Sequence, residues 1–138
     1  LEEPGVVLDS YPSLPKPDLL DELTRRRGQQ ETTFTAVGYG LQQISPVSME
    51  AKRMRMYANP RLVQISSLGA KDDFSMLLSN NRSTGGVCFG DSGGPNFLGK
   101  SSVIAGVTSF GKNGNCAGTG GVFRLDRINV LNFIESYL

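Results

Sequence analysis

Glycine is concentrated in one part of this chain, and that distribution restricts the folds open to the sequence. The 138 residues include 17 glycines, and most of them fall between residues 85 and 121. Because glycine enters backbone conformations that are closed to other residues, a cluster of glycines is typical of short strands joined by tight turns. The cluster therefore favours an all-β fold.

Several short segments rich in β-forming residues agree with this prediction. The predicted strands are 33–39, 51–57, 62–66, 74–78, 103–110 and 121–125. Within the second of them, Met54 and Met56 alternate with Arg53 and Arg55, which predicts one buried and one solvent-exposed face. The segment 103–110 is nearly all apolar or small, which is typical of a strand that is buried on both faces.

Two helical segments flank the predicted strands. A short helix begins after Asp18 as its cap, with Arg25 to Arg27 in its last turn, and an amphipathic helix follows Asp126 as its cap. Its apolar stripe is Val130, Leu131, Ile134, Tyr137 and Leu138. We therefore expect residues 1–32 to form a connecting segment with a short helix, residues 33–125 an antiparallel β domain, and residues 126–138 a C-terminal helix.

The overall charge argues against two classes of partner. Charged residues make up 20% of the chain and the net charge is +1, so no field of one sign attracts nucleic acid or a membrane surface. No apolar run reaches the roughly 18 residues that a membrane helix needs. We expect no metal and no cofactor. The opening Leu1 to Pro4 resembles the end of a strand followed by a turn, so we expect the true N-terminus to lie elsewhere.

The stretch from Gly85 to Pro95, GGVCFGDSGGP, carries the chemistry of this sequence. Glycines around Ser92 allow consecutive backbone N–H groups to point at one small volume, which is how an oxyanion hole is built. A serine in such a turn can attack a carbonyl while these donors stabilise the negative charge on its oxygen. The alternative is a glycine-rich turn with an incidental serine. The six-residue run GDSGGP is much more specific than a bare G-x-S-x-G.

This run, Gly90 to Pro95, resembles the signature around the nucleophile of chymotrypsin-like, trypsin-fold serine endopeptidases. The resemblance continues through TAVGYG at 35–40, TSFG at 108–111, GVFR at 121–124 and the last helix. It implies the second antiparallel Greek-key β-barrel of that fold, with a C-terminal α-helix. It also implies that Ser92 is the nucleophile, that the N–H groups of Gly90 and Ser92 form the oxyanion hole, and that Asp91 receives the new amino terminus when a zymogen is cleaved.

The same resemblance assigns a disulfide and a specificity pocket. A count of two cysteines alone is also compatible with two buried thiols, but Cys88 and Cys116 match the disulfide that joins the walls of the pocket, which implies an oxidising compartment. The substrate-binding positions are Gly86, Val87, Phe89, Ser109, Phe110, Gly111 and Gly121. None of them is a carboxylate, and the glycines at 111 and 121 leave room for a large side chain, so the resemblance implies a neutral pocket that prefers aromatic or aliphatic residues.

The sequence departs from this family in one respect, because it contains no histidine. In the family the catalytic histidine and aspartate precede the serine. We therefore expect this chain to be the C-terminal half of a longer protease of microbial type, secreted or periplasmic, that acts on peptides or proteins. We expect the chain to be inactive alone and to have the N-terminal half of the same protease as its partner. A non-catalytic homologue acting as a binding module is the main alternative. An α/β-hydrolase would need a histidine after the serine, and a structural β domain leaves the motif to chance.

Overall fold

A computed structural model describes residues 5–24, 32–44, 49–65 and 73–138. The predicted last helical turn, with Arg25 to Arg27, lies outside these ranges. The helices are α1 (Asp21–Thr24) and α2 (Ile128–Glu135). The strands are β1 (Phe34–Gly38), β2 (Gln43–Ile44), β3 (Met49–Glu50), β4 (Met56–Ala58), β5 (Leu62–Ile65), β6 (Ser75–Asn80), β7 (Pro95–Leu98), β8 (Ile104–Gly111) and β9 (Gly118–Arg124).

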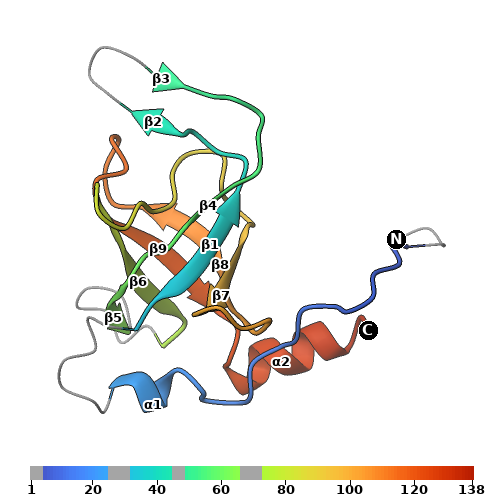
Figure 1. The fold of residues 1–138 in the computed structure, drawn as a ribbon. Helices are drawn as coiled ribbons and strands as arrows, with labels where there is room; N and C mark the ends of the chain where they lie inside the picture. Colours follow the sequence, from blue (N-terminus) through green and yellow to red (C-terminus); the bar gives the residue numbers. More distant parts are fainter. Residues whose placement is uncertain (1–4, 25–31, 45–48, 66–72) are drawn as a thin grey trace.

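Seven of these strands form one curled antiparallel sheet, in the order β4-β1-β7-β8-β9-β6-β5 (Figure 1). The two edge strands, β4 and β5, are consecutive in sequence, and the chain runs from one to the other in a single direction antiparallel to β1, with Ala58 opposite Ala36 and Arg61 opposite Thr33. At this point Phe34 N–H donates to the Pro60 carbonyl and Leu62 N–H to the Thr32 carbonyl, both at 2.8 Å. These bonds bring the two ends of the sheet together. The architecture is therefore the predicted antiparallel β domain with a short C-terminal helix.

Alternate residues of the strands fill the inside of the curled sheet. The buried cluster is Leu20, Phe34, Leu62, Met76, Leu78, Ala105 and Val122. Because side chains alternate across a strand, the neighbours of Val122, Gly121 and Phe123, point to the outer face. Leu20 comes from the segment before α1 and covers one end of the cluster, which fixes that upstream segment to the barrel.

Three details of the predicted strands are wrong. Met54 and Met56 are 55% and 48% exposed, because regular pairing begins only at Met56, on an edge strand. Residues 109–111 of β8 are exposed, so this strand is buried only in its first half. Strand β7, which begins at the last residue of the GDSGGP run, was not predicted, because Pro95 to Leu98 shows no strand periodicity.

Both predicted helix caps are also wrong. Asp18 lies three residues before α1 with a φ of 56°, and its N–H donates to the Asp126 carbonyl. The N-cap of α2 is Arg127 rather than Asp126, without a capping side-chain bond. Of the predicted stripe on α2, only Leu131 is fully buried, whereas Tyr137 is 76% exposed. No helix in the described part of the chain is long and apolar enough to cross a membrane.

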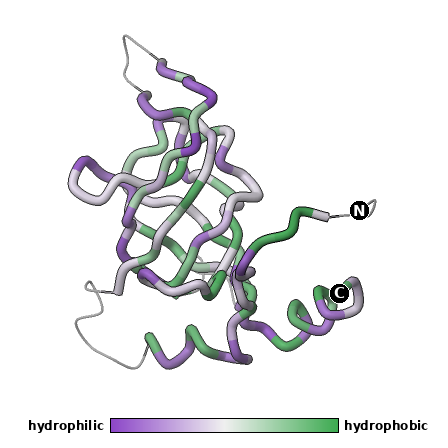
Figure 2. The backbone as a smooth tube through the Cα atoms, turned by 45° about the vertical axis from the view of Figure 1, so that its right-hand side comes forward, coloured by the Kyte–Doolittle hydropathy of each residue, from purple (hydrophilic) through white to green (hydrophobic). Residues whose placement is uncertain are grey.

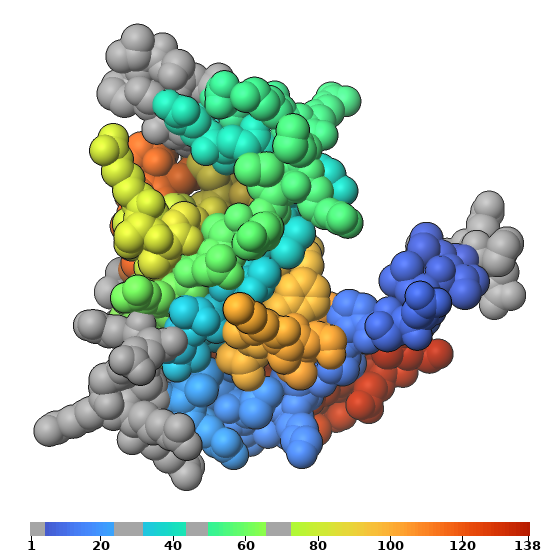
Figure 3. All heavy atoms as spheres, viewed as in Figure 1, coloured from blue at the N-terminus to red at the C-terminus, as the bar shows by residue number. Residues whose placement is uncertain are grey.

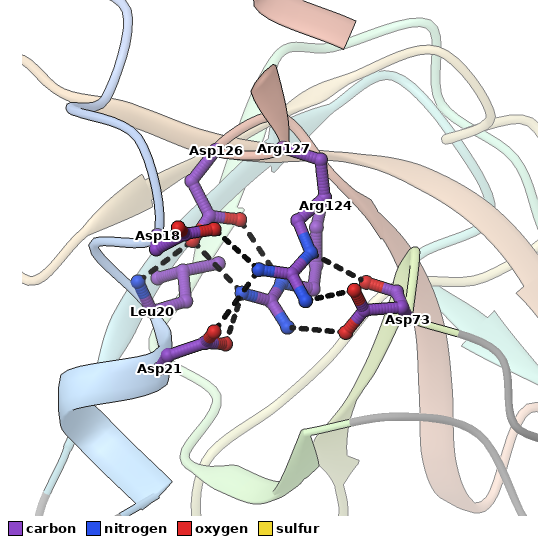
Figure 4. Close-up of polar contacts among 7 residues, drawn as sticks. All are labelled: Asp18, Leu20, Asp21, Asp73, Arg124, Asp126 and Arg127. Atoms are coloured by element: carbon purple, nitrogen blue, oxygen red, sulfur yellow. Dashed lines mark hydrogen bonds and ion pairs between the residues drawn. The ribbon is translucent and has the colours of Figure 1, made fainter. Parts of the chain in front are cut away.

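The two aspartates instead take part in a cluster of ion pairs that joins the chain upstream of β1 to its C-terminal end (Figure 4). Arg124 and Asp126, both fully buried, pair through Nε and Oδ1 at 2.9 Å and through Nη2 and Oδ2 at 2.8 Å. Arg124 also reaches Asp21 at 2.7 Å. Arg127 pairs with Asp18, Asp21 and Asp73. Finally, Leu20 N–H donates to the Asp126 carboxylate at 2.8 Å.

The cluster changes the acidity of its members. Burial raises the pKa of Asp21, but the hydrogen bond and charge of Arg124, followed by those of Arg127, outweigh it and hold this pKa below its usual range. Burial lowers the pKa of Arg124, but the hydrogen bonds that Arg124 donates to Asp126 and Asp21 more than offset that effect, so this pKa is raised overall. Both groups therefore stay charged at neutral pH.

Candidate active site

Ser92 lies in the second of two consecutive tight turns. Asp91 N–H donates to the Cys88 carbonyl at 3.1 Å, and Gly94 N–H donates to the Asp91 carbonyl at 2.9 Å, so the two turns share Asp91. The third residues of the turns are Gly90, with a φ of 93°, and Gly93, with a φ of 83°. A positive φ at this position defines a type II turn and favours glycine. The glycines of the motif are thus required by the backbone that presents the serine.

Backbone hydrogen bonds join the Ser92 turn to strand β8. Gly93 N–H donates to the Thr108 carbonyl at 3.0 Å, and Thr108 N–H donates to the Gly94 carbonyl at 2.9 Å. The fully buried Asn96 of β7 donates to the Thr108 hydroxyl at 3.0 Å, whereas its own Oδ1 has no partner among the described residues. Ser92 is exposed, and the two residues that follow it are hydrogen-bonded to β8.

The N–H groups expected to form the oxyanion hole are available. Within the described residues, neither Gly90 N–H nor Ser92 N–H has an acceptor in the protein, although the neighbouring N–H groups of Asp91, Gly93 and Gly94 are all bonded. An unpaired donor on either side of Asp91 is the arrangement that an incoming oxyanion needs.

The carboxylate of Asp91 faces away from these donors, toward the loop after β1. Its Oδ1 accepts the Gly40 N–H at 2.7 Å and its Oδ2 accepts the Cys88 N–H at 2.9 Å. A Cβ on Gly38 or Gly40 would overlap this carboxylate, so both positions must be glycine. Both glycines belong to the run TAVGYG, whose sequence does not reveal their contact with Asp91.

Asp91 also lines a cavity of about 660 Å³. The cavity extends between the end of β1, β4, the turn after β6 and the Cys88–Cys116 disulfide, whose presence confirms the expected pairing. Figure 3 shows the opening between the green atoms of residues 56–58 and the yellow atoms of residues 80–82. Gly86 and Val87 line this cavity, but Phe89, Ser109, Phe110, Gly111 and Gly121 do not.

Two of the predicted specificity positions, Gly86 and Val87, contact residues of the neighbouring strands. The Asn80 side chain lies against Gly86, where a Cβ would overlap it, and its Nδ2 donates to the Val87 carbonyl at 2.6 Å. Val87 in turn packs over Gly120. Asn80 and Gly120 are therefore neighbours of the predicted pocket that the sequence did not reveal.

One expectation about the pocket is wrong in this structure. Gly121 does not leave free space beside it, because the ring of Phe110 covers the position of its missing side chain. A Cβ on Gly111 would meet only the Asn113 carbonyl oxygen, at 3.6 Å, an ordinary van der Waals contact. Asp126 is fully buried against Arg124, and it therefore lies away from the pocket.

The sequence contains no histidine, so this chain does not supply a histidine base. Among the described residues, no group of three or more histidine, cysteine, aspartate or glutamate side chains is arranged to hold a metal ion. The described geometry thus supplies an exposed serine and two unpaired backbone donors.

The curled sheet and the serine turn define the class as the β domain of a chymotrypsin-like protease. A family model described as Trypsin matches residues 17–134, and the chain belongs to this family. No curated protein matches the chain in a sequence comparison.

Two solved structures illustrate the similarity of fold. HL collagenase is 20% identical with a TM-score of 0.61, and the match covers 90% of this chain and 51% of that one. A mutant of human heparin-binding protein is 18% identical with a TM-score of 0.66, and the match covers 97% of this chain and 53% of that one. The chain thus spans about half the length of these structures.

Proposed function

We propose that this chain is the C-terminal half of a secreted serine endopeptidase, in which Ser92 forms the acyl-enzyme. The observation that carries the proposal is the exposed serine in the second of two type II turns, with unpaired N–H groups on Gly90 and on Ser92 itself. Attack of the serine oxygen on a peptide carbonyl would place the developing oxyanion at these donors, which typically contribute about 3–4 kcal/mol each to lowering the barrier.

The base that removes the Ser92 proton comes from a segment outside this chain. In support, the chain spans about half of the matched structures, and an apolar groove lies beside the serine turn. Val37, Tyr39, Met56, Tyr57 and Phe97 line this groove together with Gly94 and Pro95. Tyr57 and Tyr39 are 71% and 59% exposed. We propose that the N-terminal half, with the histidine and the second aspartate of the triad, covers this apolar surface.

Asp91 has a second role in this proposal, as the acceptor of a newly formed amino terminus. Each of its carboxylate oxygens accepts one N–H group, and a carboxylate oxygen has room for two. The adjoining cavity of about 660 Å³ has room for a terminal residue. An ammonium group there would add a charge-assisted hydrogen bond to the turn that orients Gly90.

Reactivity of Ser92 tests the proposal directly. A serine without its base is a weak nucleophile, so the chain alone should neither hydrolyse peptides nor react quickly with a phosphonate inhibitor. The full-length protein that contains this chain should do both, and a Ser92→Ala variant should do neither. Failure of the full-length protein to cleave a broad peptide library and to react with the inhibitor would favour the alternative below.

The alternative is a non-catalytic homologue that acts as a binding module. The absence of histidine from this chain and the likeness to a protein named for heparin binding favour it. A natural protein with the mass of this chain alone, 14.9 kDa, would support this alternative, whereas a larger precursor or a copurifying chain with histidine supports the protease.

Substrate preference and location follow from the same assignment. The pocket positions Gly86, Val87, Gly111 and Gly121 carry no carboxylate, so burying a lysine or arginine side chain there would leave its charge unpaired. We propose that the complete enzyme prefers an uncharged residue before the scissile bond. The disulfide supports an extracellular or periplasmic location, and microbial origin stays a prediction from the motif.

A further inference from the structure

Asn113 and Gly114 form the one Asn-Gly pair of the sequence, and they lie in the loop between β8 and β9. Both residues are exposed. In such a pair the backbone nitrogen of the glycine can attack the side-chain carbonyl carbon of the asparagine, which closes a five-membered imide ring. Glycine favours this attack because it has no Cβ in the way and because its backbone enters conformations that are closed to other residues.

The surroundings of Gly114 leave its backbone nitrogen free to react. A Cβ built on Gly114 would have no heavy atom within 4 Å, so no neighbouring group restricts this residue. Within the described part of the chain, its N–H group donates no hydrogen bond. Hydroxide can therefore remove the proton of this nitrogen without breaking a bond that stabilises the fold.

The Asn113 side chain is held by a single hydrogen bond. Its Nδ2 donates to the Ala117 carbonyl at 2.8 Å, at an exposed position, and its Oδ1 has no partner among the described residues. A hydrogen bond of this kind slows a reaction that must break it by no more than about tenfold.

Asn81 is a natural comparison, because it is also exposed and lies in the turn after β6. Its Oδ1 accepts three hydrogen bonds, from the N–H and hydroxyl of Ser83 and from the N–H of Thr84. The residue that follows it is Arg82 rather than glycine. Exposure is thus shared by the two asparagines, whereas a free side-chain carbonyl and a following glycine belong to Asn113.

We propose that Asn113 is a site of spontaneous deamidation. The Gly114 nitrogen loses its proton and forms a bond to the Asn113 Cγ, the bond between Cγ and Nδ2 breaks, and the side-chain nitrogen takes up a proton and leaves as ammonia. One water molecule then opens the imide. Attack of water at Cγ gives aspartate, and attack at the main-chain carbonyl carbon gives isoaspartate, whose main chain continues through Cβ and Cγ.

Both products change the loop that borders the serine motif. Each adds one negative charge to a loop whose charged residue is Lys112, and takes the formal net charge of the chain from +1 to 0. Isoaspartate also lengthens the main chain of the loop by one carbon atom. Residues 115–117 of this loop line the cavity of about 660 Å³, and the disulfide joins Cys116 to Cys88 of the serine motif. The modification therefore alters charge and backbone in a loop that is covalently bound to this motif.

Mass spectrometry of the full-length protein, kept in a mildly alkaline buffer, tests the proposal. The Ser92→Ala variant is used, so that the protein does not degrade itself. Exchange of the side-chain NH₂ for OH raises the mass of the peptide that contains residue 113 by about 1 Da. The reference is a synthetic peptide of residues 108–115, which has no fold to protect it. We expect Asn113 in the protein to react at a rate within about tenfold of the rate in this peptide, and at least about tenfold faster than Asn81.

Gly114→Ala is the matched variant, because its added methyl group meets open space and leaves the fold unchanged. We expect this variant to deamidate at least about tenfold more slowly than the protein with Gly114. Reaction more than about tenfold slower than in the peptide, an equal rate in Gly114→Ala, or an equal rate at Asn81 would overturn the proposal. None of these measurements needs turnover, so their outcome is independent of the proposed function.

Discussion

Replacing Arg124 with methionine should destabilise the chain more than any other loss of a single charge in the described ion-pair cluster. Arg124 and Asp126 are both fully buried, and the arginine makes two hydrogen bonds to Asp126 and one to Asp21. Arg124→Met leaves Asp126 as a buried charge whose remaining hydrogen bond comes from the Leu20 N–H. Breaking a buried pair in this way costs about 3–5 kcal/mol of unfolding free energy.

Substitution of the partner, Asp126, should lower the free energy of unfolding by less than Arg124→Met does, because of the contacts that remain. Asp126→Asn retains an oxygen that can accept the Leu20 N–H, and Arg124 keeps its partner Asp21 at 2.7 Å. We expect a cost of about 1–3 kcal/mol, the range for a lost charged hydrogen bond. The double variant removes both charges, so its cost should fall below the sum of the single costs by about 1–3 kcal/mol.

Urea unfolding followed by far-ultraviolet circular dichroism measures these differences, since the chain has no tryptophan to report on its core. Lys52→Met is the control, because it breaks an ion pair whose side chains are 63% and 48% exposed and should cost less than about 1 kcal/mol. The reasoning is refuted if Arg124→Met costs no more than this control, or if the two single costs simply add.

Three further changes have defined outcomes. Acidification should destabilise the chain as the pH falls through the lowered pKa of Asp21. A carboxyl group with a depressed pKa stabilises the fold at pH values above its pKa in the unfolded chain, and this stabilisation is lost when the group is protonated. Thermal melts should therefore show a smaller effect of acid on Asp21→Asn. Gly90→Ala should lower the free energy of unfolding by about 1–3 kcal/mol, because it imposes a Cβ at a φ of 93° and 3.0 Å from the Gly40 Cα, and it should lower kcat of the full-length protein about 100-fold. Gly114→Ala, which meets open space, is the control and should have neither effect. Equal effects of the two substitutions would contradict the turn assignment. Replacing Cys88 and Cys116 with serine should lower the unfolding free energy by about 3.5 kcal/mol for a loop with a sequence separation of 28, and two titratable thiols in unreduced protein would exclude the bond.

The parts of the fold that the sequence predicted are those set by local pattern. Strands β1, β5, β6, β8 and β9 fall on β-forming segments, and the disulfide and the turns around Ser92 follow from the resemblance and from the glycines. Such features depend on residues close in sequence, or on a motif of six consecutive residues. They did not require knowledge of which strands are neighbours.

The predictions that failed depend on distant partners. The alternation of Met54 and Met56 with arginines is compatible with a buried face only if another layer covers it, and the described structure leaves both methionines exposed. Aspartate is a common helix cap, but the carboxylates of Asp18 and Asp126 bind arginines instead. Asp18 pairs with Arg127, which is 109 residues away in sequence, and Asp126 pairs with Arg124. The overlap of Phe110 with Gly121 depends on one added residue at Ser109, which no periodicity reveals.

The order in which this chain leaves the ribosome gives the ion-pair cluster a further meaning. Asp18 and Asp21 are synthesised before their arginine partners, which follow 103 to 109 residues later. At a translation rate of about 5–20 residues per second, Arg124 and Arg127 are synthesised roughly 5–20 s after the two aspartates. During translation the apolar segment around Val6 to Leu8, which lies apart from the curled sheet (Figure 2), and the unpaired β6 are exposed together. Strand β6 thus stays without its β9 partner until residues 118–124 have been synthesised.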